Sequence, residues 1–126
     1  FIPSESVCEL NVIDTASQKL VKVITLPPHS RPQTVIVSPD GKKVYVSTGR
    51  GGTVCVVDAN TYQVLDNIKV GKRPWGITLS PDGKYLFAAN CPSDDVSVVD
   101  LATDKEIARV KAPGRPGGVV AVPDGK

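Results

Sequence analysis

The sequence is poor in the residue types that catalytic and metal sites most often use. Its 126 residues contain no methionine, one histidine and one tryptophan. A Ser-His-Asp triad needs a histidine, and only His29 is available for one. The cysteines at 8, 55 and 91 form no Cys-x-x-Cys pair, which excludes a zinc-ribbon or thioredoxin-like motif. Without methionine, Phe1 is not expected to be a translation start, so we expect a processed or partial chain.

Long apolar runs and one-sided charge are also absent. No stretch approaches the roughly 18 apolar residues that a membrane-spanning helix needs. Lysine and arginine number 15 against 13 acidic residues, and both signs are spread along the chain, with a net charge of +2. Because there is no basic tail or stripe, nucleic acid is not expected as a partner. We therefore expect neither a membrane span nor a nucleic-acid complex.

What the sequence does contain is an internal repeat. The segment Ser-Pro-Asp-Gly-Lys at 38–42 returns at 80–84, and Pro-Asp-Gly-Lys returns at 123–126, with a step of 42 residues. An arginine precedes a proline at the same step, at Arg31, Arg73 and Arg115. The aspartates at 14, 58 and 100 are separated by 44 and 42 residues, and the two extra residues fall in the linker 27–30.

Each repeat is predicted to form four short strands joined by tight turns. In the copy that begins at Arg73, apolar runs bounded by turn residues predict strands at 76–80, 85–90, 96–100 and 106–111. Pro-Asp-Gly suits a type I turn between the first two strands, because proline presets φ and glycine tolerates the positive φ that follows. The aspartates at 14, 58 and 100 lie where the third strand turns into the fourth. Their carboxylates are expected to accept backbone N–H groups, which is a structural role.

Four antiparallel strands in each repeat of this length indicate one β-propeller blade, a sheet that buries both faces against its neighbours. The segments 44–48, 86–90 and 96–100, each beside a Ser-Pro-Asp-Gly-Lys turn, resemble the YVTN β-propeller repeat. The resemblance covers nearly the whole chain. It implies an all-β chain, a β-propeller segment of three four-stranded blades.

The repeat boundaries predict how the chain divides among blades. Residues 1–30 are expected to hold the third and fourth strands of a split blade, 31–72 and 73–114 one blade each, and 115–126 the first strand of the split blade. Because propellers close with roughly four to eight blades, three cannot form a ring and would expose strand edges. Further blades are therefore expected, either from a longer chain or from a second copy that completes six.

One face of a propeller carries the loops that enter the inner strands and the loops between the second and third strands. On this face we place the candidate residues for a ligand or partner, Arg31, Gln33, Arg50, Arg73, Trp75, Asn90 and Arg115. The three arginines at the repeat step would form an arc of guanidinium groups suited to a carboxylate or phosphate. Alternatively, each arginine bonds backbone carbonyls or an aspartate of its own or the next blade, because repeats propagate packing devices.

Trp75 is the one candidate without a counterpart of its own type, since Gln33 and Gly117 occupy its place in the other copies. A tryptophan there either stacks on a ligand or partner or fills space between two inner strands. His29, in the two-residue insertion, is expected to be solvated, and no metal is assigned.

The cysteines lie in different settings. Cys8 and Cys91 occupy corresponding loops two blades apart, which is too far for a disulfide. Cys55 falls in a strand and is expected to be a buried apolar residue. Cys91, if exposed, would be open to an intermolecular bridge, but no nearby base is evident to activate it.

No catalytic constellation emerges, so the first hypothesis is a non-enzymatic binding or scaffold propeller whose loop face holds a small anionic ligand or a protein partner. No cofactor is expected in this segment under that hypothesis. The second is that the blades belong to a larger redox enzyme, because similar propellers hold haem in cytochrome nitrite reductases and form the large subunit of some amine dehydrogenases. The third is a half-propeller, engineered or natural, that dimerises into six blades. The resemblance also implies a periplasmic, secreted or cell-surface location.

Overall fold

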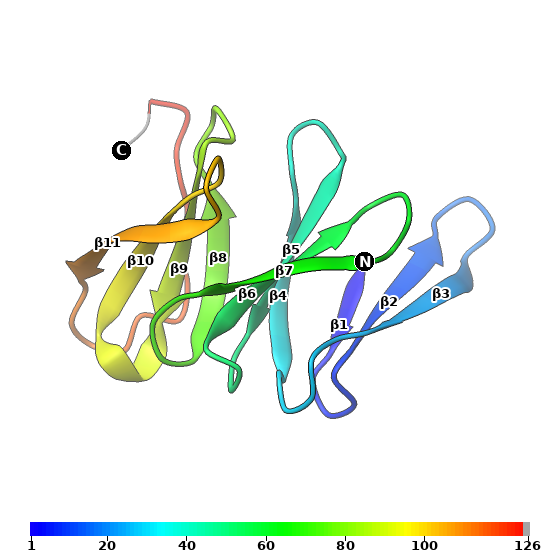
Figure 1. The fold of residues 1–126 in the computed structure, drawn as a ribbon, viewed down its shortest axis with the longest axis horizontal. Helices are drawn as coiled ribbons and strands as arrows, with labels where there is room; N and C mark the ends of the chain where they lie inside the picture. The colour runs from blue at the N-terminus through cyan, green and yellow to red at the C-terminus, as the bar shows by residue number, and fades with distance from the viewer. Residues whose placement is uncertain (125–126) are drawn as a thin grey trace.

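The structure, a computed structural model that describes residues 1–124, consists of three antiparallel sheets placed side by side (Figure 1). The first sheet contains β1 (Ile2–Ser4), β2 (Glu9–Asp14) and β3 (Lys19–Thr25). The second contains β4 (Pro32–Val37), β5 (Lys43–Thr48), β6 (Thr53–Asp58) and β7 (Val64–Lys69). The third contains β8 (Pro74–Leu79), β9 (Tyr85–Asn90), β10 (Asp95–Asp100) and β11 (Lys105–Lys111), with the 3-10 turn η1 (Cys91–Ser93) between β9 and β10. In the described residues there is no helix that could cross a membrane.

The predicted strands of the copy that begins at Arg73 correspond to the third sheet. β9 has the predicted bounds, whereas β8, β10 and β11 begin one or two residues earlier than predicted. The earlier starts arise because backbone pairing continues beyond the apolar runs, as where Asp95 and Pro74 both pair with Asn90. Within each sheet the strands pair in chain order, and a register shift recurs at the equivalent place between the third and fourth strands. The prediction of an all-β propeller segment is confirmed.

The two complete Pro-Asp-Gly turns have the predicted geometry. Gly41 and Gly83 have φ angles of 71° and 70°, in the left-handed region that glycine tolerates. The Gly41 N–H donates to the Ser38 carbonyl at 2.9 Å, and the Gly83 N–H donates to the Ser80 carbonyl at 2.8 Å. These bonds close the turn between the first and second strands of each blade.

The recurring aspartates bind the backbone of the next turn, as predicted. Asp58 Oδ1 accepts the N–H groups of Asn60 and Thr61, both at 2.8 Å. These bonds, that of Thr61 first, hold the pKa of Asp58 below its usual value. Asp14 and Asp100 likewise accept backbone N–H groups two or three residues ahead, at 2.8 and 2.9 Å. The structural role of these aspartates is confirmed.

The second sheet is buried on both faces, because its side chains alternate between two cores. Val44 and Val46 of β5 face the first sheet, whereas Tyr45 between them faces the third. The core between the first and second sheets contains Leu10, Val12, Ile24, Leu26, Val44, Val46, Cys55 and Val57. The core between the second and third sheets contains Tyr45, Val54, Val56, Ile68, Val70, Ile77, Leu86, Ala88 and Val99. Cys55 is fully buried, as expected.

The segment after β11 departs from the repeat prediction. The predicted first strand within 115–126 is not formed in residues 112–124, and residues 125–126 lie outside the described chain. This segment instead runs beside β8, where the Gly76 N–H donates to the Gly117 carbonyl at 3.1 Å. Its expected partner is the second strand of the split blade. This chain contains part of that strand as β1, which lies at the opposite end of the row of sheets (Figure 1). Without a paired neighbour, the segment has no ladder to join.

Apolar side chains remain exposed on the fourth strands of the two outer sheets. Leu20 and Val21 of β3 are 57% and 54% exposed, and Ile107 and Val110 of β11 are both 56% exposed. Exposed apolar surface of this kind usually marks a contact with another part of the structure.

Candidate functional site

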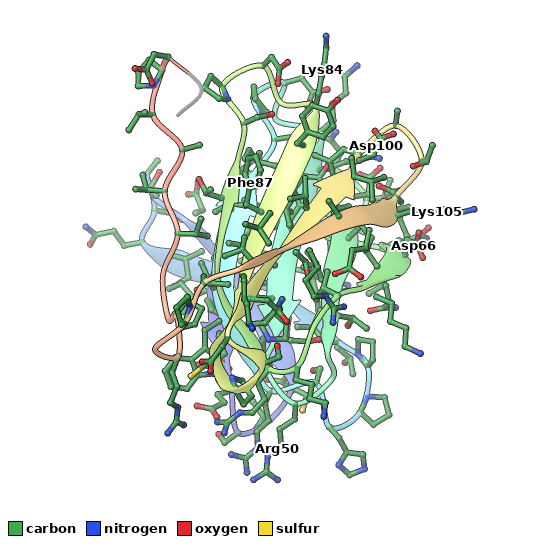
Figure 2. All side chains as sticks on the ribbon, turned by 90° about the vertical axis from the view of Figure 1, so that its left-hand side faces the viewer. Arg50, Asp66, Lys84, Phe87, Asp100 and Lys105 are labelled. Carbon is green, nitrogen blue, oxygen red and sulfur yellow. The ribbon has the colours of Figure 1, made fainter. Side chains whose placement is uncertain are left out.

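Five of the seven predicted site residues meet at one end of the sheets. We call this the loop end, because it carries the connections from β1 to β2, β3 to β4, β5 to β6, β7 to β8 and β9 to β10 (Figure 1). Figure 2 shows Arg50 at this end and Lys84 at the opposite one. A cavity of about 30 Å³ at the loop end is lined by Glu5, Arg31, Gln33, Gly49, Arg50, Arg73 and Trp75. That volume holds about one water molecule, so these side chains form a packed surface.

Arg31 is already paired with an acidic side chain. Its Nη1 lies 3.3 Å from Glu5 Oε1 in the β1–β2 loop, and both side chains are about half exposed. An exposed ion pair of this kind contributes about 0–1 kcal/mol to stability. Its main effect is to reduce the positive charge of Arg31 and to link the first sheet to the second.

Arg73 and Trp75 form the second contact of this surface. The guanidinium carbon of Arg73 lies 5.7 Å from the centre of the Trp75 ring, within the range of a cation–π interaction. The Ser47 hydroxyl, buried in the second sheet, donates to the Trp75 carbonyl at 2.6 Å. The neighbouring blade therefore fixes the backbone of Trp75, while 38% of the residue remains exposed.

The arginines before proline share a backbone conformation in all three copies. The φ angles of Arg31, Arg73 and Arg115 are 49°, 49° and 59°, in the left-handed region that residues other than glycine rarely adopt. The carbonyls of Arg31 and Arg73 accept the N–H groups of Gly49 and Cys91, at 2.9 and 3.4 Å. The repeated feature is thus a backbone turn formed by the main chain of each arginine. The side chains of Arg31 and Arg73 have different contacts.

Arg115 and Asn90 do not line the cavity. The backbone N–H of Arg115 donates to Asp94 Oδ1 at 2.8 Å. Of the three arginines of the expected arc, Arg31 and Arg73 line this cavity. Asn90, expected on the loop face, is fully buried because it ends a central strand beneath the β7–β8 connection.

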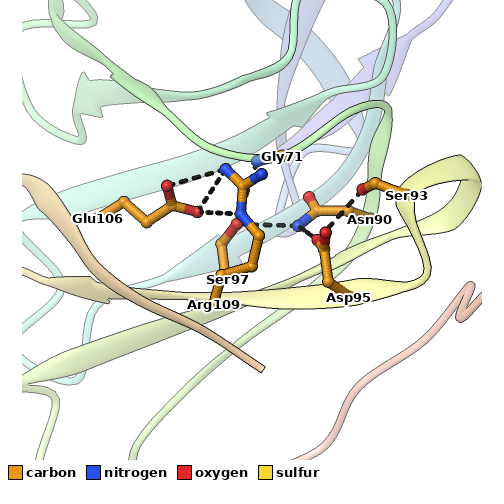
Figure 3. A network of polar contacts seen from close by, with 7 residues as sticks. All are labelled: Gly71, Asn90, Ser93, Asp95, Ser97, Glu106 and Arg109. Atoms are coloured by element: carbon orange, nitrogen blue, oxygen red, sulfur yellow. Dashed lines mark hydrogen bonds and ion pairs between the residues drawn. The ribbon is translucent and has the colours of Figure 1, made fainter. Parts of the chain in front are cut away.

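Asn90 organises a buried polar network between the second and third sheets (Figure 3). Its Nδ2 donates to Asp95 Oδ1 at 2.7 Å and to Ser97 Oγ at 2.8 Å. Ser97 Oγ also accepts the Gly71 N–H at 3.1 Å, which joins the end of the second sheet to the third. Within residues 1–124 no donor reaches Asn90 Oδ1. The network is structural, and it holds the β7–β8 connection in place.

The residue just before the third strand of each blade (β2, β6 and β10) has a left-handed backbone conformation. The φ angles of Cys8, Gly52 and Asp94 are 56°, 64° and 53°. The carbonyl of each accepts an N–H group from the end of its own fourth strand, at 2.9, 3.1 and 2.8 Å. The backbone conformation at this position is thus shared by the three loops, while the side chain differs in each.

The three cysteines are free thiols with distinct environments. The backbone N–H of Arg31 and the Ser30 hydroxyl lie near the Cys8 sulfur and lower the pKa of this thiol. Burial raises the pKa of Cys55 to about 12. Cys91 is only 6% exposed, which corrects the idea of an exposed thiol, because η1 folds this residue beneath the loop.

His29, the single histidine of the sequence, is exposed in the β3–β4 loop. Among residues 1–124, no group of three or more His, Cys, Asp or Glu side chains is placed to hold a metal ion.

A larger cavity at the loop end was missed by the sequence analysis. It lies between the second and third sheets, has a volume of about 550 Å³, and is lined by Arg50, Gly51, Gly52, Lys69, Val70, Gly71, Lys72, Arg73, Pro92 and Arg109. Its lysines, Lys69 and Lys72, are exposed and look in sequence like ordinary solvated charges. The one available signal is that Lys72 and Arg50 become Gly114 and Pro92 in the next copy.

A third cavity, also about 550 Å³, lies at the opposite end between the two Pro-Asp-Gly turns. Its carboxylates Asp40 and Asp82 are occupied within their own turns, where each accepts a serine hydroxyl at 2.6 Å. Its lysines alternate with these carboxylates, so the cavity has no dominant charge. The loop end therefore offers the better-defined binding chemistry.

Comparison with known proteins identifies related sequences and structures. The sequence profile of a family described as "Lactonase, 7-bladed beta-propeller" matches residues 3–117. A search of the curated proteins finds no significant match.

Three solved structures share the arrangement of the sheets. Hydrazine synthase from Kuenenia stuttgartiensis is 30% identical, with a TM-score of 0.90 over 97% of this chain. A protein of unknown function from Desulfotomaculum acetoxidans (21% identity, TM-score 0.76, 93% of this chain) and virginiamycin B lyase from Staphylococcus aureus (16%, 0.76, 90%) share the fold. The chain spans 35% of the hydrazine synthase chain and 39% of each of the other two.

Proposed function

Because this chain belongs to the seven-bladed β-propeller family of lactonases, we propose that its three sheets are blades of such a ring and that their loop end binds a small anionic ligand or a partner protein. One observation carries the proposal: side chains from the start of β4, the start of β8 and the β5–β6 loop converge on one surface, namely Arg31, Gln33, Arg50, Arg73 and Trp75. Arginine and tryptophan are the residues most enriched at binding hot spots.

The remaining blades are proposed to come from outside this stretch of sequence. Two copies of three sheets would give six blades, one fewer than the family has. The chain spans about a third of the solved relatives, and its outer strands keep apolar side chains exposed. These observations favour a seven-bladed ring over a six-bladed homodimer.

Chemistry within this stretch is not part of the proposal. General acid–base catalysis needs a titratable group near the substrate, and the charged residues that line the small loop-end cavity in the described chain are three arginines and one ion-paired glutamate. Binding and positioning are the functions that such a surface supports.

A second candidate function is a place within a larger enzyme whose chemistry lies elsewhere. The similarity to hydrazine synthase, at 30% identity and a TM-score of 0.90, favours it. An absorption spectrum of the protein purified with its native partners tests it, because a haem or quinone would show its bands, and a colourless complex at full occupancy would argue against a coloured cofactor.

The primary proposal is tested with the double variant Arg73→Ala, Trp75→Ala. Both side chains are exposed, so the circular dichroism spectrum should be unchanged. Calorimetric titration with citrate and with inorganic phosphate should show weaker binding than in the unchanged chain. A matched control, Lys84→Ala with Tyr85→Ala at the opposite end, should bind normally. Equal affinity in all three proteins would show that the loop end is not the binding surface.

A further inference from the structure

The larger loop-end cavity is a groove with an unbalanced charge. We call it the cationic groove and define it by Arg50, Lys69, Lys72, Arg73 and Arg109. These five side chains are a third of the chain's 15 lysines and arginines. Arg50 comes from the β5–β6 loop, Lys69 from the end of β7, Lys72 and Arg73 from the β7–β8 connection, and Arg109 from β11. No acidic residue lines the groove.

Four of the five cations have no acidic partner. The ion pairs within residues 1–124 are Arg31–Glu5, Lys84–Asp82 and Arg109–Glu106. Only Arg109 is neutralised, because its Nη2 lies 2.9 Å from both oxygens of Glu106 (Figure 3). Positive charges held around one concave site repel each other, and an anion in the site would remove that cost.

Comparison between copies shows that three of the five groove charges are not part of the repeat. The equivalents of Arg50 are Ser6 and Pro92, that of Lys72 one blade later is Gly114, and that of Arg109 one blade earlier is Asn67. The other two charges do recur, Arg73 as Arg31 and Arg115, and Lys69 as Lys111. At the gap between the first and second sheets, Arg31 is paired with Glu5. The gap between the second and third sheets therefore combines repeated charges with charges of its own.

The backbone leaves space beside these charges. Gly51, Gly52 and Gly71 contribute main-chain atoms to the wall of the groove. A volume of about 550 Å³ lies in the ordinary range for small-molecule sites. Arginine binds phosphoryl oxygens in pairs, and lysine adds point charges, which together suit a compact ligand of high negative charge.

We propose that the cationic groove binds a small ligand that carries two phosphoryl groups, as in a sugar bisphosphate or a nucleoside diphosphate. Two phosphoryl groups supply about three to four negative charges, which matches four unpaired cations. This inference rests on the proposed anion-binding function of the loop end and names its ligand class. It places the ligand between two blades, outward from the surface formed by Arg31 and Trp75.

Inorganic pyrophosphate is the probe, with orthophosphate and succinate as the comparison anions. Calorimetry at low ionic strength should show one site, with pyrophosphate bound more tightly than either comparison anion. Lys69→Ala combined with Lys72→Ala should weaken pyrophosphate binding roughly tenfold or more. Lys72→Glu, a single exposed change, should have a similar effect. The control Lys19→Ala, Lys22→Ala on β3 removes the same charge and should stay within about twofold of the unchanged chain.

The outcomes separate this inference from the broader proposal. Equal losses in the groove and control variants would mean that only net charge matters and would overturn the groove. A loss in Arg31→Ala, Trp75→Ala with none in the groove variants would keep the loop-end function and reject the groove. Tighter binding of succinate than of pyrophosphate would reject the phosphoryl class. The sugar bisphosphate and nucleoside diphosphate sources are then distinguished by titrating fructose 1,6-bisphosphate and ADP.

Discussion

Gly71 lies directly against the side-chain amide of Asn90 on the neighbouring sheet, and no space remains there for a Cβ atom. The Asn90 amide is held from its other side by Asp95 and Ser97. Since Gly71 also lines the cationic groove, this contact positions one wall of the groove. The fit between two blades and the shape of the binding surface therefore depend on the same pair of residues.

The variant Gly71→Ala should destabilise the chain by about 1–3 kcal/mol, because the added methyl group meets the fixed Asn90 amide in a packed interface. Chemical denaturation followed by circular dichroism measures the change. In the double variant Gly71→Ala, Asn90→Ala the added cost of the alanine should be smaller than in the unchanged background. Strict additivity of the two changes would contradict the contact.

Cys8 should be the first of the three thiols to react in the folded chain. The backbone N–H of Arg31 and the Ser30 hydroxyl lower the pKa of Cys8, whereas burial raises that of Cys55 to about 12 and Cys91 is nearly covered. Alkylation with iodoacetamide between about pH 6 and 9, read by peptide mass spectrometry, should modify Cys8 fastest. Cys8→Ser should remove the fast phase, and a fast phase that persists would locate it at another cysteine.

Stability should fall in acid through the turn aspartates. Hydrogen bonds hold the pKa of Asp14, Asp40, Asp58 and Asp82 below the value of 3.8 for a free side chain. The folded state therefore binds fewer protons than the unfolded state, so the stabilisation present above pH 3.8 is lost as the pH drops below it. Denaturation midpoints measured from pH 6 to pH 2 should decrease. Asp58→Asn should flatten the decrease, and an unchanged slope would show that Asp58 does not contribute.

Alkaline unfolding should depend on Tyr45. This residue is 3% exposed, and burial, with smaller effects from Asp104 and Asp40, raises its pKa to about 12. Because the unfolded side chain ionises near pH 10, the stability linked to Tyr45 is complete below pH 10 and is lost as the pH rises toward 12. Tyr45→Phe should reduce the alkaline loss of stability. The same slope in both proteins would rule out this linkage.

The fold follows from the sequence because its signals are local and repeated. The Pro-Asp-Gly turn places Gly41 and Gly83 at positive φ, and an aspartate such as Asp58 closes the next turn with its own carboxylate. In the apolar run 44–46, successive side chains point to opposite faces of the sheet, so Tyr45 enters one core and its two neighbours enter the other. The segment 112–124 was predicted less well, since a strand forms only where a partner strand pairs with it.

The site was predicted in part because the loop end follows from the strand order, whereas contacts across blades do not. The positions of Arg31, Arg73 and Trp75 at one cavity follow from topology. The Arg31–Glu5 pair joins residues 26 apart in sequence, and no periodic pattern links them. Asn90 ends a predicted strand and was expected on the loop face, but the preceding blade covers it, as only three-dimensional packing reveals.

The left-handed position shared by Cys8, Gly52 and Asp94 has a consequence for how such a repeat diversifies. Each copy inherits the same main-chain path, so a thiol, a hydrogen atom or a carboxylate can be exchanged there without redrawing the loop. Duplication of the repeat thus supplies a position whose side chain can change. The substitution Cys8→Asp or Gly52→Asp is a direct way to give a second blade an acidic group at the loop end.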